Sequence, residues 1–140
     1  MKPHINLEGE IMGIEPEDKE IWEKSFCVGN ASEIEAFANS VGITNLLCRS
    51  AEVARKAGMP DVVAPHSLLH GFLEALIGEN TPGSEIKKME LEFQKPVSAG
   101  TTVLISCQAS HLNRFVYVAV MIMSRDELVA TGSCTLQLPS

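Results

Sequence analysis

Residues 64–78 read APHSLLHGFLEALIG, and this stretch determines what the rest of the chain can build. Its apolar side chains recur at spacings of three and four residues, which is the period of an α-helix. They are Leu68, Leu69, Phe72, Leu73, Leu76 and Ile77. Gly71 and Ala75 lie between them, so little of the circumference is polar and we predict a helix buried on most sides. Pro65 suits the first turn, and Gly71 in the interior predicts close packing of another backbone.

A run of strands is predicted after this helix, beyond the break at Glu79-Asn80-Thr81-Pro82-Gly83. Between Ile86 and Lys95 apolar and polar residues alternate, which is typical of a strand with one dry face and one wet face. Phe115–Met123 is apolar throughout, which predicts a strand covered on both faces. The expected strands are 86–95, 102–109, 115–123 and 128–138, with Ser124–Glu127 as a tight connection.

The part of the chain before the helix is predicted to supply one more strand and two shorter helices. Asn30 with Glu33 forms a capping-box pattern at the start of a helix that ends at Val41. The predicted segments are a strand at 21–28, helices at 30–41 and 50–57, and a possible arm or edge strand within 1–19. This order indicates one α+β domain over residues 1–140, with an antiparallel sheet curled around one long helix. Dimerisation is expected to cover an edge strand.

Composition narrows the functional classes. The net charge is −7 and no basic stripe is present, so nucleic acid is not an expected partner. The first twenty residues are too charged for a signal peptide and no apolar run has the length of a membrane span, which predicts a cytoplasmic protein away from membranes. Four cysteines (Cys27, Cys48, Cys107 and Cys134) stand far apart without metal-ligand spacing, so free thiols and no metal site are expected.

Five segments carry a resemblance to the MaoC-like (R)-specific enoyl-CoA hydratase and 3-hydroxyacyl dehydratase family, which has the hot-dog fold. That family has a helix ending in Phe-Ala…Ser-Gly, a loop Asp-x-Asn-Pro-x-His, a short helix Pro-Glu-x-Ala-x-x-Ala-Gly, and a strand ending in Phe-x-Arg-Pro-Val-x-x-Gly. The similar segments here are FANSVG (37–42), ITNLLC (43–48), AEVARKAG (51–58), VAP (63–65) and FQKPVSAG (93–100). The resemblance spans about residues 20–138 and implies acid–base chemistry on an acyl thioester.

The two catalytic positions of the resembled family are occupied differently in this sequence. Ile43 stands at the position of the family's Asp and Cys48 at that of its His. Hydration or dehydration requires groups that exchange protons near neutral pH, which Ile43 cannot do and an unperturbed thiol does poorly. Asn45 is retained, but an amide can orient a substrate and cannot act as a base. By the usual mechanism of the family, this chain is expected to be a poor hydratase or none.

The remaining candidates cluster around the predicted central helix. His66 and Ser67 are expected to present backbone N–H groups to a thioester carbonyl, as the resemblance implies and as helix N-termini allow. Cys48 and His66 are the candidate catalytic residues, and Asn45, Ser67 and Lys95 the candidate substrate contacts. His70 is expected to hydrogen-bond a backbone carbonyl rather than a metal ion. A buried Glu74 would be a further candidate.

Three classes of function remain open from the sequence, and the last of them is a ligand-binding module that binds no thioester. The first is an acyl-thioester-binding subunit, or a weakly active or retasked dehydratase, with coenzyme A or phosphopantetheine as substrate carrier and no resident cofactor. Such a subunit is expected to form a homodimer or a heterodimer with a catalytic MaoC-like paralogue. The alternative is an active hot-dog thioesterase, or a cyclase or isomerase, that uses Cys48, His66 or Glu79.

Overall fold

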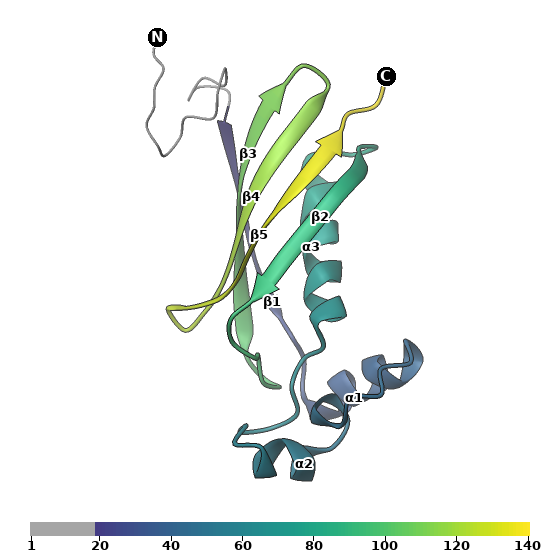
Figure 1. The fold of residues 1–140 in the computed structure, drawn as a ribbon, viewed down its shortest axis with the longest axis vertical. Helices are drawn as coiled ribbons and strands as arrows, with labels where there is room; N and C mark the ends of the chain where they lie inside the picture. Colours follow the sequence, from purple (N-terminus) through teal and green to yellow (C-terminus); the bar gives the residue numbers. More distant parts are fainter. Residues whose placement is uncertain (1–18) are drawn as a thin grey trace.

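The computed structural model describes residues 19–140, so the prediction of an arm or edge strand within residues 1–19 lies almost entirely outside the described residues. Figure 1 shows the order of the elements along the chain. They are β1 (Lys19–Cys27), α1 (Ala31–Ser40), the 3-10 helix η2 (Leu46–Cys48), α2 (Ala51–Lys56), α3 (His66–Asn80), β2 (Glu85–Phe93), β3 (Thr102–Leu112), β4 (Phe115–Ser124) and β5 (Glu127–Gln137). Every helix and strand predicted within the described part of the chain is confirmed, and η2 is an addition in the predicted loop 43–48.

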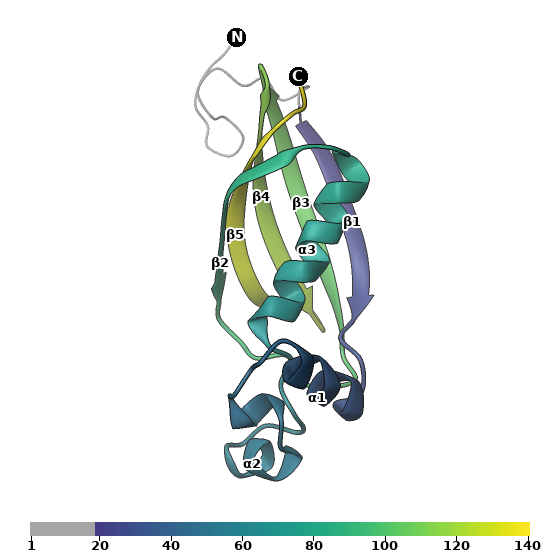
Figure 2. The ribbon, with the colours of Figure 1, turned by 90° about the vertical axis from the view of Figure 1, so that its right-hand side faces the viewer.

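The strands form one antiparallel sheet in the order β1-β3-β4-β5-β2. Figure 2 shows α3 crossing the concave face of this sheet, which confirms the predicted α+β arrangement of a curled sheet around one helix. Strands β1 and β2 are the two edges of the sheet. No helix in residues 19–140 combines the length and the apolar character needed to cross a membrane.

The core lies between the sheet and one side of α3. Leu69, Leu73, Leu76 and Ile77 are buried against inward-facing side chains of the strands. The opposite side of the helix is exposed, at Gly71, Glu74, Ala75 and Gly78. The prediction that the helix is buried on most sides is therefore wrong for the single chain. Small apolar residues made the sequence look uniformly apolar, although the sheet covers only one side.

Gly71 does not serve close packing, which corrects a second prediction. A Cβ placed on Gly71 would have no heavy atom within 4 Å. The glycine that close packing requires is Gly132 on β5, where a Cβ would overlap the carbonyl oxygen of Glu90 and lie 2.6 Å from Cδ2 of Leu91. Since Leu91 pairs with Gly132, this glycine allows β2 to approach β5.

Strand β4 is covered on one face only, contrary to the prediction of two covered faces. Val116, Val118, Val120 and Ile122 are buried, whereas the residues between them point to the exposed face of the sheet. The exposed positions include Phe115, Tyr117 and Met121. Large apolar side chains on a wet face gave this strand its continuous apolar appearance.

The predicted capping box is present at the start of α1. The Glu33 N–H donates to Oδ1 of Asn30 at 2.9 Å, and the Asn30 N–H donates to Oε1 of Glu33 at 2.9 Å. Both α1 and α2 lie beyond the end of the sheet, next to the start of α3 (Figure 2). They therefore build up the surface around the N-terminus of the central helix.

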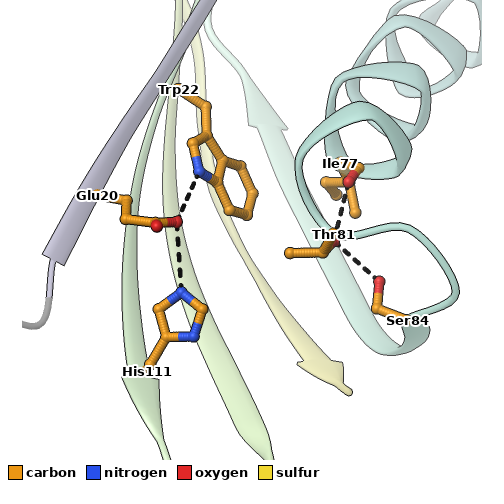
Figure 3. A network of polar contacts seen from close by, with 6 residues as sticks. All are labelled: Glu20, Trp22, Ile77, Thr81, Ser84 and His111. Atoms are coloured by element: carbon orange, nitrogen blue, oxygen red, sulfur yellow. Dashed lines mark hydrogen bonds and ion pairs between the residues drawn. The ribbon is translucent and has the colours of Figure 1, made fainter. Parts of the chain in front are cut away.

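Figure 3 shows the polar groups at the other end of the molecule. The buried Thr81 hydroxyl donates to the Ile77 carbonyl at 2.8 Å and lies 2.9 Å from the Ser84 hydroxyl, so it ends α3 without an unsatisfied group. On β1 and β3, Oε1 of Glu20 accepts from Nε1 of Trp22 at 3.1 Å and contacts Nε2 of His111 at 3.4 Å. These contacts join elements of the fold to one another. We therefore look for a functional site at the N-terminal end of α3.

Candidate functional site

The N-terminus of α3 presents two backbone donors without a protein acceptor. Pro65 occupies the N-cap position, has no N–H of its own and makes no side-chain cap. Its carbonyl accepts the N–H of Leu68 at 3.0 Å, but within residues 19–140 no group accepts the N–H of His66 or Ser67. Both residues are exposed. A helix end with free N–H groups and a partial positive charge favours a carbonyl oxygen or an anion.

Backbone hydrogen bonds hold the segment before α3 between two loops. The Val63 N–H donates to the Leu47 carbonyl at 2.8 Å, and the Ala64 N–H donates to the Val97 carbonyl at 2.8 Å. Val63 also forms an isolated antiparallel bridge with Ser98. The loop of η2, the start of α3 and the β2–β3 loop therefore meet at one place.

His66 is held in its orientation by an aromatic stack. Its ring lies over Phe93 of β2 with centroids 3.7 Å apart and an interplanar angle of 8°. His70, one turn further along α3, meets the same Phe93 edge-on at 6.1 Å. Burial, together with the charge of His70, lowers the pKa of His66 below its ordinary value of 6.5. The ring is therefore neutral at pH 7 and able to accept a proton.

Phe93 is a site residue that the sequence assigned only to the dry face of a strand. Its place in the motif FQKPVSAG was the signal in the sequence that could have pointed to it. Its stacking on His66, however, depends on how β2 lies against α3. The imidazole of His70 makes no hydrogen bond within residues 19–140, so the expected bond to a backbone carbonyl is absent there, and the ring instead contacts Phe93.

Cys48 ends η2 and is only 3% exposed. Burial raises the pKa of its thiol above the ordinary value, so the group is protonated at neutral pH. Ile43 is half-buried and its N–H donates to the Ala38 carbonyl at 2.8 Å. Oδ1 of Asn45 accepts the N–H of Leu47 at 3.0 Å and thereby caps η2. The loop thus has well-defined structural roles for all three residues and no ionised group among them.

Lys95 borders a separate hollow next to this site. Its ammonium group lies 3.3 Å from Oε2 of Glu127, with both side chains about half exposed. The hollow has a volume of about 330 Å³ and lies between the β2–β3 loop, the β4–β5 hairpin and the segment Met59-Pro60. Val97 and Ser98 form part of its wall, and these are the residues that bind the segment before α3.

A family model described as "FAS1-like, dehydratase domain region" matches residues 23–131. The chain belongs to this family. A curated relative from Solanum lycopersicum, the mitochondrial 3-hydroxyacyl-[acyl-carrier-protein] dehydratase FERN, is 30% identical over 102 residues, which is 69% of this chain and 62% of that protein. The chain therefore spans less than two thirds of the length of this relative.

Solved structures share the hot-dog fold of this chain. An (R)-hydratase from A. caviae involved in PHA biosynthesis superposes with a TM-score of 0.79 at 21% identity, over 92% of this chain and all of that chain. The ChsH1-ChsH2 complex from Mycobacterium tuberculosis gives a TM-score of 0.78 at 17% identity, again over 92% of this chain and all of the matched chain. At these identities the likeness concerns the fold, and it confirms the resemblance drawn from the sequence.

Glu79 does not lie near the start of α3. From His66 to Glu79 the helix rises roughly 20 Å, so the carboxylate lies at the opposite end of α3. There it forms an ion pair with Lys24 of β1, with Nζ and Oε2 2.6 Å apart. Glu74 is exposed, so the condition under which it would be a further candidate is not met. Within residues 19–140 no three potential metal ligands come together.

Proposed function

We propose that this chain is the acyl-thioester-binding member of a hydratase or dehydratase assembly. The observation that carries the proposal is the pairing of an open helix N-terminus at His66 and Ser67 with a loop that has Ile43 and Cys48 where the resembled family has Asp and His. The first feature suits binding of a thioester carbonyl. The second removes the usual groups for proton transfer.

Binding requires only groups that are present. A thioester carbonyl placed at the start of α3 accepts hydrogen bonds from the N–H groups of His66 and Ser67, and the helix dipole favours the charge on its oxygen. The carrier of the acyl group, coenzyme A or phosphopantetheine, is then part of the substrate, and the proposal includes no resident cofactor.

Catalysis requires proton-transfer groups in addition to a binding site. In hydration, water adds across the C2=C3 bond of an enoyl thioester, so its hydroxyl goes to C3, a proton goes to C2, and a base takes the proton that the water loses. Ile43 has no titratable group, and burial raises the pKa of the Cys48 thiol. Neither residue provides a base or an acid matched to neutral pH.

A catalytic partner chain can provide the acid and the base that this chain does not have. Within residues 19–140, β1 and β2 are the outer strands of the sheet, and a second hot-dog domain can extend the sheet at such an edge. The matched ChsH1-ChsH2 structure is itself a complex of two different chains. We propose a heterodimer with a paralogue that has the Asp and the His; a homodimer is the alternative assembly. The cytoplasm remains the proposed compartment.

One observation favours a second candidate function, a retasked enzyme. His66 is exposed, has a lowered pKa and belongs to the same helix end as the free N–H groups. It can therefore act as a general base on a water next to a bound thioester. Cys48, which is buried, and Glu79, which is paired with Lys24, fit such a role less well.

The test is hydration of crotonyl-CoA by the purified protein and by two double variants. The double variant Ile43→Asp with Cys48→His restores the proton-transfer groups, and Ile43→Asn with Cys48→Gln is the matched control with similar size and polarity. The proposal expects no turnover by the wild type, turnover by the Asp/His variant, and none by the Asn/Gln control. Binding of crotonyl-CoA by all three proteins, measured by calorimetry, accompanies the activity assay.

Each other outcome has a defined meaning. Wild-type turnover that His66→Gln abolishes and Glu79→Gln preserves supports the retasked enzyme instead. Absence of crotonyl-CoA binding by the wild type contradicts the binding function. Appearance of a heterodimer when a paralogue with an intact loop is co-expressed supports the proposed assembly, and two separate species in size-exclusion chromatography contradict it.

A further inference from the structure

We propose that the hollow bordered by Lys95 and Arg125 binds a phosphate group of the acyl carrier. This inference rests on the proposed function and adds a second anchoring point to it. The hollow has a volume of about 330 Å³, within the range of small-molecule sites. Three segments far apart in the sequence form it: Met59-Pro60, the β2–β3 loop and the β4–β5 hairpin.

The charge of the hollow is opposite to that of the whole chain. The protein has a net charge of −7, but the hollow is lined by two cations, Lys95 and Arg125, and one anion, Glu127. Arg125 makes no ion pair or hydrogen bond with any residue in the range 19–140. A local excess of positive charge in an acidic protein, with a free guanidinium group, favours a phosphate, which arginine binds through two parallel hydrogen bonds.

The backbone at Arg125 is unusual. Arg125 and Asp126 have φ angles of 53° and 65°, and they form the two-residue turn between Ser124 and Glu127. Such turns strongly favour Asn-Gly or Gly-Gly, because residues with a larger side chain are strained at positive φ. The turn geometry therefore does not account for an arginine here. Strained residues of this kind concentrate at functional sites.

The position of the hollow relative to α3 suits a carrier chain. Its wall residues Val97 and Ala99 are hydrogen-bonded to the segment that leads into the helix: the Ala64 N–H donates to the Val97 carbonyl at 2.8 Å, and the Ala99 N–H donates to the Val62 carbonyl at 2.9 Å. The start of α3 and the wall of the hollow are thus joined through one hydrogen-bonded segment, residues 62–64. The flexible arm of the carrier can connect the two points.

The carboxylate of Glu127 is expected to limit the affinity of the hollow for an anion. Its carboxylate pairs with Lys95 at 3.3 Å, and an exposed pair of this kind is weak. A phosphate has to compete with this carboxylate for the lysine. Removal of the carboxylate charge is therefore expected to strengthen phosphate binding, whereas removal of Arg125 is expected to weaken it.

The experiment compares crotonyl-CoA with crotonyl-pantetheine, which has the same thioester and no phosphate. Isothermal titration is done with the full chain and with Arg125→Gln, Glu127→Gln and Arg114→Gln. The last variant is the control, since it removes the same charge in the β3–β4 connection, at the opposite end of the sheet from the β4–β5 hairpin (Figure 1). We expect Arg125→Gln to weaken crotonyl-CoA binding about five- to tenfold, Glu127→Gln to strengthen it, and Arg114→Gln to leave it unchanged.

The thioester without phosphate separates this proposal from the proposed function. If both ligands bind equally well and Arg125→Gln changes neither, the phosphate site is wrong while the thioester site stands. If neither ligand binds, both proposals fail. A parallel titration with a crotonylated carrier protein, in which phosphopantetheine provides the phosphate, shows by its own sensitivity to Arg125→Gln which of the two carriers the hollow serves. Insensitivity with both carriers overturns the proposal.

Discussion

Substitution of Gly132 by alanine tests how β2 is positioned. Gly132 pairs with Leu91, and an added Cβ would overlap the Glu90 carbonyl oxygen and lie 2.6 Å from Leu91 Cδ2. Since carbon atoms pack at about 3.5–4.0 Å, the two strands have to separate by about 1 Å. β2 ends at Phe93, on which His66 stacks, so the displacement is expected to reach the start of α3.

The magnitude follows from the cost of overpacking, about 2–3 kcal/mol for a change that moves backbone. A domain of 140 residues unfolds with an entropy of about 0.3 kcal/mol/K, so the melting temperature is expected to fall by about 7–10 °C. Urea unfolding followed by the fluorescence of Trp22, the single tryptophan, measures the free energy of unfolding directly.

Gly71→Ala is the matched control, because it makes the same chemical change on an exposed helix face with no atom within 4 Å of the new Cβ. It is expected to increase the free energy of unfolding by about 0.5–1 kcal/mol through helix propensity alone. The reasoning is refuted if Gly132→Ala unfolds within about 0.5 kcal/mol of the wild type, a change typical of an unstrained surface position. Equal damage by both substitutions would show that a second chain covers the outer side of α3.

Two further predictions concern titratable groups. Histidine resonances should give His66 a pKa below 6.5, and His70→Gln should raise this pKa, since the charge of His70 contributes to the shift. The unfolded chain binds this proton more readily than the folded chain does. The stability contributed by neutral His66 is therefore present above pH 6.5 and is lost as the pH falls through that value. His66→Gln should flatten the plot of unfolding free energy against pH in this range, and an unchanged plot would contradict the assignment. Alkylation followed by mass spectrometry should modify the exposed Cys27 first, and early modification of any other cysteine would contradict the burial described. The thiols expected to be protected are Cys48, Cys107, with a pKa raised by burial to about 12, and Cys134, with a pKa raised by burial to about 11.

Local signals in the sequence were sufficient for most of the fold. The capping pattern of Asn30 and Glu33 located the start of α1, and alternation located β2 and β5. Errors arose where burial depends on what another element covers. The outer face of β4 and the outer side of α3 contain apolar or small residues that are exposed in the single chain, and periodicity alone cannot report this.

In the candidate site, too, the features that depend on local sequence were predictable, and those that depend on contacts between distant elements were not. The position of His66 and Ser67 at a helix N-terminus follows from Pro65 and the apolar period, and the structure confirms it. The stack of His66 on Phe93 and the approach of Arg125 to Lys95 join residues about thirty positions apart, across element contacts that no local pattern encodes. Arg125 in a turn that favours glycine was nevertheless a visible signal.

The backbone that holds the start of α3 is independent of the two side chains at the resembled family's catalytic positions. The segment before the helix is fixed by backbone hydrogen bonds to Leu47 and Val97, and the free N–H groups of the first turn depend on backbone geometry alone. None of these bonds involves the side chain of Ile43 or Cys48. Exchange of those two side chains can therefore change the acid–base groups of the loop while the free N–H groups of the first turn remain in place. For the same reason, restoring Asp and His should return chemistry to a site that is already formed.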